Sequence, residues 1–162
     1  MIDRLVTLVA KSFAWFAVLF VVLMLLKHFN IGYLTVNKTP SIATGIYWVM
    51  PKAIPSKGND VVIEYKGQHF EKGVHLVKHI VAVDGDVIAH NGNQVMINGK
   101  ATTAMIKPTT LHGEPLLPGP VGSVPIGEYF VLGDHLDSFD SRYGHLGFVK
   151  PAQIVGKAVR LL

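Results

Sequence analysis

The chain contains no cysteine and few charged residues. Without Cys among its 162 residues, it can form neither disulfides nor thiolate nucleophiles nor cysteine-ligated zinc sites. Charged residues account for 16% of the sequence and hydrophobic ones for 49%, which excludes a disordered or fibrous chain. The formal net charge is +4, but the 15 Lys and Arg residues are scattered singly rather than clustered as on a nucleic-acid surface. No nucleic-acid partner is therefore expected.

The hydrophobic residues concentrate near the N-terminus. Residues 12–26 are uncharged, and the wider stretch Leu5 to Leu26 is interrupted only by Lys11. As a helix, this stretch is roughly 33 Å long, enough to cross the hydrocarbon core of a bilayer. It is apolar around its whole circumference, so a small domain would have to surround it completely to bury it. We therefore expect residues 1–34 to form a membrane anchor with a helix over about residues 5–28.

A cleavable signal peptide is the alternative interpretation of this segment, because Arg4 and Lys11 precede the apolar run. The residues that follow the run, 27–33, offer no small-x-small cleavage site, which favours an uncleaved single-pass anchor. Lys27 and Lys38 balance Arg4 and Lys11 across the run, so charge alone leaves the orientation in the membrane undetermined.

Beyond about residue 35, short β-branched and aromatic runs alternate with Gly, Pro and Asn, as is typical of strands and turns. We therefore expect residues 35–162 to form one β-rich domain. Asn91-Gly92 and Asn98-Gly99 predict hairpin turns, since both residue types tolerate the positive φ of a type I′ turn. The segment 107–125 is rich in proline and glycine and is expected to be an extended loop. The runs predict strands at 45–50, 60–65, 74–83, 87–90, 94–97, 128–132 and 154–160.

Lys78 stands out within the predicted strand 74–83, because the other residues on its face are apolar. If that face packs inward, burial lowers the pKa of the lysine ammonium, and a neutral lysine can act as a general base. A half-exposed face, or a side chain that reaches the solvent, would instead leave Lys78 an ordinary surface lysine. The residues that share its face are Val74, Leu76, Ile80 and Ala82.

A lysine base requires a nucleophile, and in a chain without cysteine this must be Ser, Thr or Lys. Ser41 lies in the short polar stretch before the first predicted strand, directly after Pro40, whose ring restricts the backbone. Taken alone, Ser41 is equally well explained as an ordinary loop serine.

A dense polar segment, residues 133–144, follows the predicted strand 128–132. Loops at strand ends often carry function, although Asp140 and Arg142 could equally serve a structural turn. Asp134 and His135 could form a triad with Ser41, but no Gly-x-Ser-x-Gly elbow accompanies them.

A metal site is a further class to consider, because the chain contains eight histidines. His75 and His79 lie on the same face of one predicted strand, where four residues span roughly 13 Å, too far for both to bind one ion. No metal or cofactor is therefore expected.

Three segments, in this order, resemble the type I signal peptidase (leader peptidase) family of membrane-bound Ser/Lys proteases. Thr39-Pro40-Ser41 resembles the nucleophile segment, residues 76–86 resemble the lysine segment with its trailing Gly-Asp, and residues 131–144 resemble the Gly-Asp…Asp-Ser-Arg segment. Residues 154–158 also resemble the segment that ends the catalytic domain. The similarity covers most of residues 37–160.

The resemblance implies a mostly β fold, an all-β catalytic domain preceded by one N-terminal transmembrane helix. It implies a serine endopeptidase in which Ser41 attacks the scissile carbonyl and Lys78 accepts the hydroxyl proton. It further implies that the Ser41 N–H and the Thr39 hydroxyl form the oxyanion hole and that Ser138 orients the Lys78 amine. Asp140 and Arg142 would brace the loop.

The resemblance also implies a location and a substrate. The catalytic domain would lie on the outer, periplasmic side of the bacterial cytoplasmic membrane. The substrate would be a membrane-tethered preprotein with small residues at the cleavage site, bound as an added strand along an open sheet edge.

Some residues depart from the housekeeping pattern of the family. Ile42 follows the serine where Met is common, and His79 follows the lysine where Arg is usual. The small size and the pattern Ser41-x-x-x-Gly45-Ile46-Tyr47 resemble instead the conjugative-transfer peptidases of TraF type, which mature pilin subunits and in some cases cyclise them.

Two questions stay open from the sequence. One is whether the product is released by water or by cyclisation. The other is whether the chain is instead a non-catalytic, membrane-tethered β-domain that scaffolds a secretion or conjugation complex. In that case the apolar loop residues Leu116, Leu117 and Val121 would contact a partner.

Overall fold

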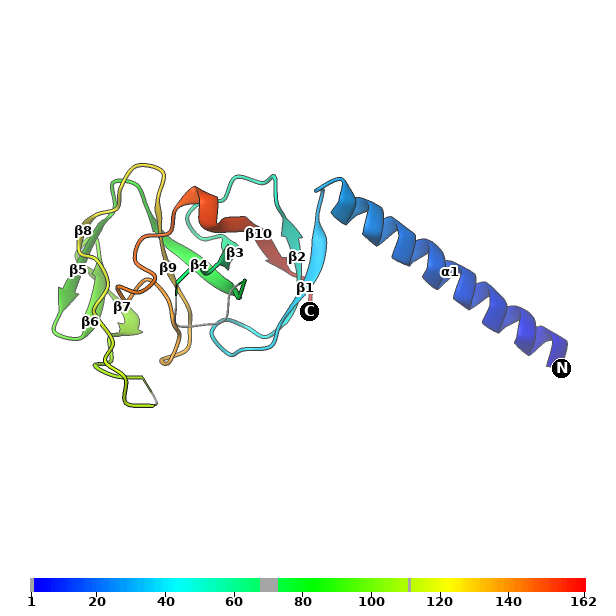
Figure 1. Ribbon diagram of the computed structural model, residues 1–162, viewed down its shortest axis with the longest axis horizontal. Coiled ribbons are helices and arrows are strands. Elements are labelled where there is room, and N and C mark those ends of the chain that lie inside the picture. Colours follow the sequence, from blue (N-terminus) through cyan, green and yellow to red (C-terminus); the bar gives the residue numbers. More distant parts are fainter. Residues whose placement is uncertain (1, 68–72, 111) are drawn as a thin grey trace.

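The computed structural model describes residues 2–67, 73–110 and 112–162, apart from the side chain of Asp3. One long helix precedes a domain built from two antiparallel sheets, which confirms the mostly β fold (Figure 1). The elements are α1 (Ile2–His28), β1 (Tyr33–Asn37), β2 (Gly45–Met50), β3 (Asp60–Glu64), β4 (His75–Val83), β5 (Val87–Asn91), β6 (Gln94–Ile97), β7 (Lys100–Met105), β8 (Gly122–Ser123), β9 (Tyr129–Leu132), the 3-10 helix η1 (Pro151–Gln153) and β10 (Ile154–Arg160).

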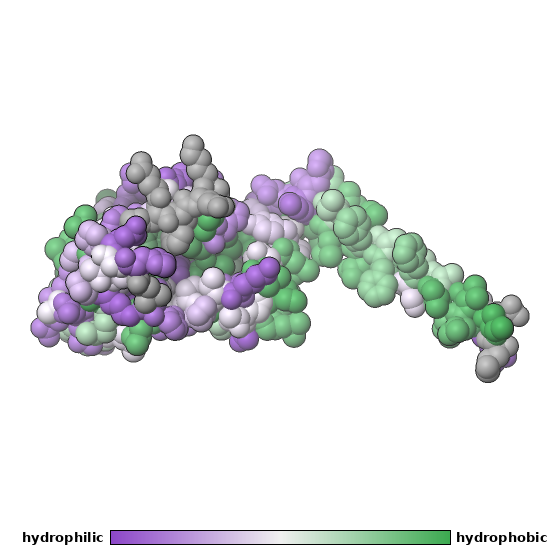
Figure 2. Space-filling view, turned by 60° about the horizontal axis from the view of Figure 1, so that its bottom comes forward, coloured by the Kyte–Doolittle hydropathy of each residue, from purple (hydrophilic) through white to green (hydrophobic). Residues whose placement is uncertain are grey.

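Helix α1 is long and apolar enough to cross a membrane. The most apolar 18-residue window of its span Arg4–His28 has a mean hydropathy of 2.3, and none of that window is buried against the rest of the described protein. Figure 2 shows this helix as a projecting rod covered with hydrophobic side chains. It begins three residues earlier than expected and ends at His28 as expected.

The end of α1 has a local cause. Asn30 adopts a φ of 57°, and the N–H of Ile31 donates to the Leu26 carbonyl at 2.9 Å, while Asn30 N–H donates to the Lys27 carbonyl at 3.0 Å. This is the Schellman arrangement, in which a left-handed residue satisfies the last helical carbonyls and reverses the chain. The chain thereby leaves the helix directly into β1.

The larger sheet has the strand order β1-β2-β10-β3-β4-β9, and the smaller has the order β7-β6-β5-β8. In the larger sheet, β3 and β4 pair so that Val61 lies opposite Lys78 and Val62 opposite Val77. Val61 and Ile80 belong to one buried cluster, and Val62 and Val77 to another. The β3–β4 pair is therefore covered on both faces in its middle, where Val77 and Lys78 are buried.

The predicted strands at 45–50, 94–97 and 154–160 agree with β2, β6 and β10, and the other four differ by one residue at an end. Three strands were not predicted. The apolar side chains of Leu34 and Val36 in β1 are exposed, so the run lacks a hydrophobic-in, polar-out pattern. Strand β7 contains Lys and Ala, which have low strand propensity, and is held by its pairing with β6.

The expected loop 107–125 also needs a correction, because it contains the short strand β8, which pairs with β5. Leu111 within it lies outside the described residues. A two-residue strand carries too little periodicity to be recognised in a Pro- and Gly-rich segment.

One of the two predicted hairpin turns is displaced by one residue. Asn98 and Gly99, with φ of 51° and 74°, form the turn between the paired residues Ile97 and Lys100, as expected for type I′. In the other hairpin Asn91 already pairs with Gln94, so the turn residues are Gly92 and Asn93. Only Gly92 of these two has a positive φ, as in a type II′ turn.

Candidate active site

The turn that carries Ser41 is organised by the buried side chain of Asn37, at the end of β1. Its Nδ2 donates to the carbonyls of Thr39 at 3.0 Å, Ile42 at 3.2 Å and Ala43 at 3.2 Å, while its Oδ1 accepts from the Thr39 N–H at 3.3 Å. The next residue after Ser41, Ile42, is buried and anchors the turn in the core. Asn37 was missed in the sequence, although an Asn side chain commonly accepts a hydrogen bond from the backbone two residues further on and so favours a turn.

The Ser41 side chain has one described hydrogen-bond partner. Ser41 Oγ and Thr39 Oγ1 lie 3.0 Å apart and share a hydrogen bond. Thr39 Oγ1 also donates to Asn37 Oδ1 at 3.0 Å. Because a hydroxyl has only one proton, Thr39 accepts from Ser41 whenever it donates to Asn37.

The carbonyl of Ser41 joins the turn to the segment that follows β9. The Asp134 N–H donates to this carbonyl at 2.6 Å. Gly133 permits the approach, since a Cβ there would lie 2.4 Å from Ser41 O and 2.2 Å from Ser138 Oγ. The turn and the segment after β9 therefore touch at a point that has no room for a side chain.

Lys78 is buried, with 2% of its surface exposed, on the face of β4 that also carries Ile80 and Ala82. Its Nζ donates a hydrogen bond of 2.8 Å to Ser138 Oγ, which is also buried. Burial lowers the pKa of Lys78 to about 8, against the opposing attraction of the Asp140 carboxylate. A substantial fraction of the amine is therefore neutral near pH 8.

Asp140 and Arg142 form a fully buried ion pair beneath this site. Arg142 Nε donates to Asp140 Oδ1 at 2.8 Å and its second guanidinium nitrogen to Oδ2 at 2.9 Å. Asp140 also accepts the Gly133 N–H at 2.8 Å, and Arg142 donates to the carbonyls of Gly133 and Leu136. Each buried charge thus has several partners, and the pair fixes the shape of the segment 133–142.

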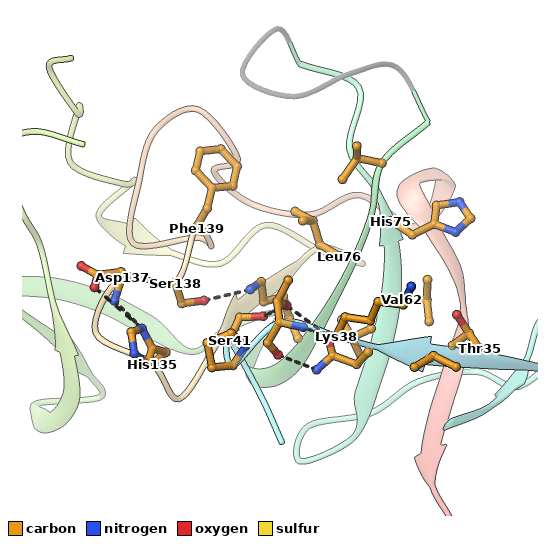
Figure 3. A pocket seen from close by; sticks show the side chains of 17 residues that line it. Thr35, Lys38, Ser41, Val62, His75, Leu76, His135, Asp137, Ser138 and Phe139 are labelled. Atoms are coloured by element: carbon orange, nitrogen blue, oxygen red, sulfur yellow. Dashed lines mark hydrogen bonds and ion pairs between the residues drawn. The ribbon is translucent and has the colours of Figure 1, made fainter. Parts of the chain in front are cut away.

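A groove of about 660 Å³ runs past Ser41 and Lys78 (Figure 3). One wall is the segment 35–41, which includes the C-terminal part of β1, an edge strand of the larger sheet, and the turn with Ser41. The facing wall is the segment 74–78, and the described pairing of β4 with β9 begins only at His79. The groove therefore has a strand edge on each side, and His135, Asp137, Ser138 and Phe139 close it on a third.

The alternative triad is not assembled. The His135 ring accepts the Asp137 N–H at 3.1 Å, and the Asp134 carboxylate bonds to His79 instead. Asp137 also forms an ion pair with Lys107. Ser41, His135 and Asp134 are thus neighbours without a connected chain of side-chain hydrogen bonds.

His79, the residue after Lys78, lies between two carboxylates. Its Nδ1 is 2.5 Å from Asp60 Oδ1 and its Nε2 is 3.1 Å from Asp134 Oδ2. Because the two carboxylates bind opposite nitrogens of one ring, the three groups cannot surround a single ion. No set of three or more His, Asp or Glu that could hold a metal ion occurs among the residues that the structure describes.

The apolar loop residues lie away from these groups. Leu116 is half-buried against the core cluster of the smaller sheet, whereas Leu117 and Val121 are exposed. None of the three lines the groove.

Comparisons with known proteins identify the family. The sequence model described as "Signal peptidase, peptidase S26" matches residues 5–162. Signal peptidase I of Bacillus caldolyticus is 31% identical over 164 residues, which cover 91% of this chain and 87% of that protein. Signal peptidase I of Bacillus licheniformis is 36% identical over 94 residues, covering 53% of this chain and 50% of that protein.

Among solved structures, a signal peptidase I from Enterococcus faecalis V583 matches 65% of this chain and 97% of that chain, with a TM-score of 0.42 and 23% identity. The family match includes the Ser41 turn, the Lys78 strand and the segment 133–144. The chain belongs to the signal peptidase family, peptidase S26, and is a serine peptidase.

Proposed function

We propose that the chain is a membrane-anchored endopeptidase in which Ser41 is the nucleophile and Lys78 the general base. The observation that carries this proposal is that the buried amine of Lys78 and the hydroxyl of Ser41 line the same groove. Burial keeps a fraction of the amine neutral, and its hydrogen bond to Ser138 leaves the nitrogen lone pair free to accept a proton.

In the proposed reaction, Ser41 Oγ attacks the carbonyl carbon of the scissile peptide bond and its proton passes to Lys78 Nζ. The resulting ammonium then protonates the leaving amine, and water or a second amine releases the acyl group from Ser41. Before attack, Ser41 Oγ turns from Thr39 toward Lys78, because its described hydrogen bond runs to Thr39. Ser138 holds the amine throughout.

The Ser41 N–H and the Thr39 hydroxyl are proposed to stabilise the oxyanion. The Thr39 hydroxyl now donates to Asn37, so it must rotate to reach an oxyanion. Asn37 would keep the turn in place during this rotation, since its amide also holds the carbonyls of Ile42 and Ala43. Asp140 and Arg142 hold the backbone of the segment 133–142 in place and do not contact the substrate.

The groove supports an extended peptide as substrate. The segments 35–41 and 74–78 both line it, and β1 is an edge strand, so a substrate segment could add as a strand between them. The exposed apolar surface of α1 supports membrane anchoring of residues 1–34, which leaves residues 35–162 as the catalytic domain. We propose that this domain lies on the periplasmic side of the inner membrane and cleaves exported preproteins.

The proposed physiological substrate is a pilin precursor of a conjugation system. The support is the pattern Ser41-x-x-x-Gly45-Ile46-Tyr47, in which Gly45 has a φ of 146° and begins β2, and the Tyr47 hydroxyl donates to the Ala43 carbonyl at 2.6 Å. These residues shape the turn that presents Ser41. Cyclisation would require that the amine which attacks the acyl group be the substrate's own N-terminus.

The test uses the full-length chain in detergent with two substrates, a preprotein with a signal peptide and a pilin-like precursor. Ser41→Ala and Lys78→Ala should each lower cleavage at least about 1000-fold, since either change removes a reacting group. Ser123→Ala and Lys66→Ala, both on the exposed surface, serve as controls and should leave cleavage unchanged. For the unaltered enzyme, kcat/KM should rise with pH through about 8 as Lys78 loses its proton.

Full activity of the Lys78→Ala enzyme would contradict the dyad, as would activity that depends on a metal and disappears with a chelator. An acylating serine probe that labels Ser41 supports the enzyme, and a folded chain that it does not label supports the scaffold alternative. Intact mass of the product separates hydrolysis from cyclisation, because a cyclic product lacks one further water.

A further inference from the structure

His79 follows Lys78 on β4 and projects from the opposite face of the strand. Asp60 lies directly across from it in the β3–β4 register, and Asp134 lies two residues beyond the end of β9. The imidazole ring of His79 on β4 thus connects the Asp60 side chain of β3 with the Asp134 side chain of the segment that follows β9. Asp60 and His79 are partly buried, whereas the Asp134 side chain is 66% exposed.

The hydrogen-bond geometry determines the protonation of the ring. A carboxylate can only accept, and a neutral imidazole has one N–H, so it could donate to Asp60 or to Asp134 but not to both. Since both nitrogens of His79 have a carboxylate oxygen within 3.1 Å, the charged imidazolium is the form that satisfies the site. The hydrogen bond to Asp60, with a smaller contribution from Asp134, raises the pKa of His79 to about 9.

Asp134 links this histidine to the candidate nucleophile. Its carboxylate bonds to the His79 ring, while its backbone N–H donates to the Ser41 carbonyl at 2.6 Å. The preceding residue, Gly133, lies against both Ser41 O and Ser138 Oγ. The His79 ring therefore ties the strand that carries Lys78 to the segment that holds Ser41 and Ser138.

We propose that His79 is a positioning residue, which as an imidazolium clamps Asp134 to β4 and so holds Ser41 and Ser138 in register with Lys78. This role rests on the proposed function. When the ring loses its proton, one of the two hydrogen bonds is lost, and the more exposed Asp134 side is the one released. The segment 133–138 then loosens and turnover falls.

Among the groups around the ring, His79 is the one expected to lose its proton near pH 9. Asp60 and Asp134 are its direct partners. The Tyr47 side chain on β2 lies near both carboxylates. Burial, and to a smaller extent these two carboxylates, raise the pKa of Tyr47 above the ordinary 10, so Tyr47 stays protonated near pH 9. The Asp134 carboxylate also attracts the Lys78 ammonium. The pKa of Lys78 is nevertheless about 8, so most Lys78 side chains are already neutral as the pH approaches 9. The activity should therefore rise through about 8 and fall through about 9.

The first experiment measures kcat and KM against pH for the full-length enzyme and two variants. His79→Arg keeps a cation at all accessible pH, so it should retain neutral activity and lose the falling limb. His79→Gln is neutral at all pH, so it should lower kcat about tenfold at pH 8, with KM changed much less. His112→Gln, in an exposed loop, is the control and should preserve the whole profile.

The second experiment observes the His79 ring directly and does not depend on activity. Nuclear magnetic resonance of the histidine rings should find both nitrogens of His79 protonated at pH 7, with a titration midpoint near 9 in the unaltered chain. A neutral ring at pH 7, or an alkaline limb that persists unchanged in His79→Arg, would overturn the proposal. Lowered thermal stability of His79→Gln with an unchanged kcat would likewise reduce His79 to a structural role.

The two proposals can fail separately. If Ser41→Ala and Lys78→Ala abolish cleavage but the His79 variants behave as the control does, only the positioning role is wrong. If Ser41→Ala or Lys78→Ala remains active, the dyad is wrong whatever state the His79 ring shows.

Discussion

At the scale of single residues, Lys78 shows how the site uses a group that the fold tolerates poorly. A lysine ammonium is strongly hydrated, and its burial on β4 favours the neutral amine. Its described hydrogen-bond partner is the hydroxyl of Ser138, while the nearby Asp140 carboxylate is engaged by Arg142. The desolvation that keeps part of the amine neutral therefore costs folding free energy.

This cost predicts that Lys78→Met is more stable than the unaltered protein at neutral pH. The folded pKa of about 8 lies below the ordinary 10.5, so the folded state binds fewer protons and its stability rises with pH between these values. Removal of the desolvation penalty of Lys78 should raise the free energy of unfolding by about 1–3 kcal/mol at pH 7. This range already subtracts the loss of the hydrogen bond to Ser138. Thermal denaturation of both proteins in the same detergent measures the difference.

The advantage of the methionine variant should shrink as the pH rises from 8 toward 10. Comparison of the two proteins at each pH cancels the opposite trend from His79, whose raised pKa contributes stability that is lost as the pH rises through about 9. A difference between the two free energies of unfolding that stays constant from pH 8 to pH 10 would show that Lys78 does not titrate in this range.

At the scale of elements, the segment 133–142 is the part that assembles the site. It contacts the Ser41 turn through Asp134 N–H and supplies Ser138 to Lys78, while the buried pair of Asp140 and Arg142 fixes its path. Gly133 is where the segment and the turn come closest. A change in backbone spacing here would alter the distances between Ser41, Lys78 and Ser138 without removing any of these side chains.

Gly133→Ala should therefore lower kcat by about 100-fold or more, because the new methyl group would meet Ser41 O at 2.4 Å and force the turn and the segment apart. Gly144→Ala is the control in the same region, since its methyl group would come no closer than 3.1 Å to Pro118 O. Single-turnover cleavage by the two variants measures the effect. Equal activity of the two variants would show that the close contact between Gly133 and the Ser41 carbonyl is not needed for cleavage.

At the scale of the whole molecule, α1 and the β domain differ in surface chemistry. Most of the described side chains of α1 are apolar, and they are exposed along its length, whereas the domain presents a mixed surface (Figure 2). Water is a poor solvent for such a helix and a bilayer a good one, so the two parts are suited to different surroundings. Under the proposed function, the helix would keep the groove close to the membrane.

Charge in the middle of α1 should weaken membrane association. Val18→Asp should make insertion less favourable by about 2.5–3.5 kcal/mol, which is the cost of a central acidic residue. Flotation of the full-length chain with lipid vesicles measures this, and Val18→Leu provides an apolar control. If α1 anchors the chain, less of the Val18→Asp protein than of the control should float with the vesicles.

The sequence by itself determined the features that depend on near neighbours along the chain. The apolar run predicts α1, the alternation in 74–83 predicts the inward face of Lys78, and Asn98-Gly99 predicts its turn. These predictions succeed for two reasons. The spacing of apolar residues shows which faces of a helix or strand are buried, and the backbone preferences of Asn and Gly act locally in a turn.

Only the tertiary structure decided which of these segments meet. Neither the contact of Asp134 with Ser41 nor the placement of Asp60 and Asp134 on either side of His79 can be read from the chain, because both depend on sheet order and register. Strand β1 was overlooked for a related reason, since its apolar side chains point outward and only its pairing with β2 defines it. Long-range pairing satisfies backbone groups that local sequence leaves open, and this determines the geometry of the site.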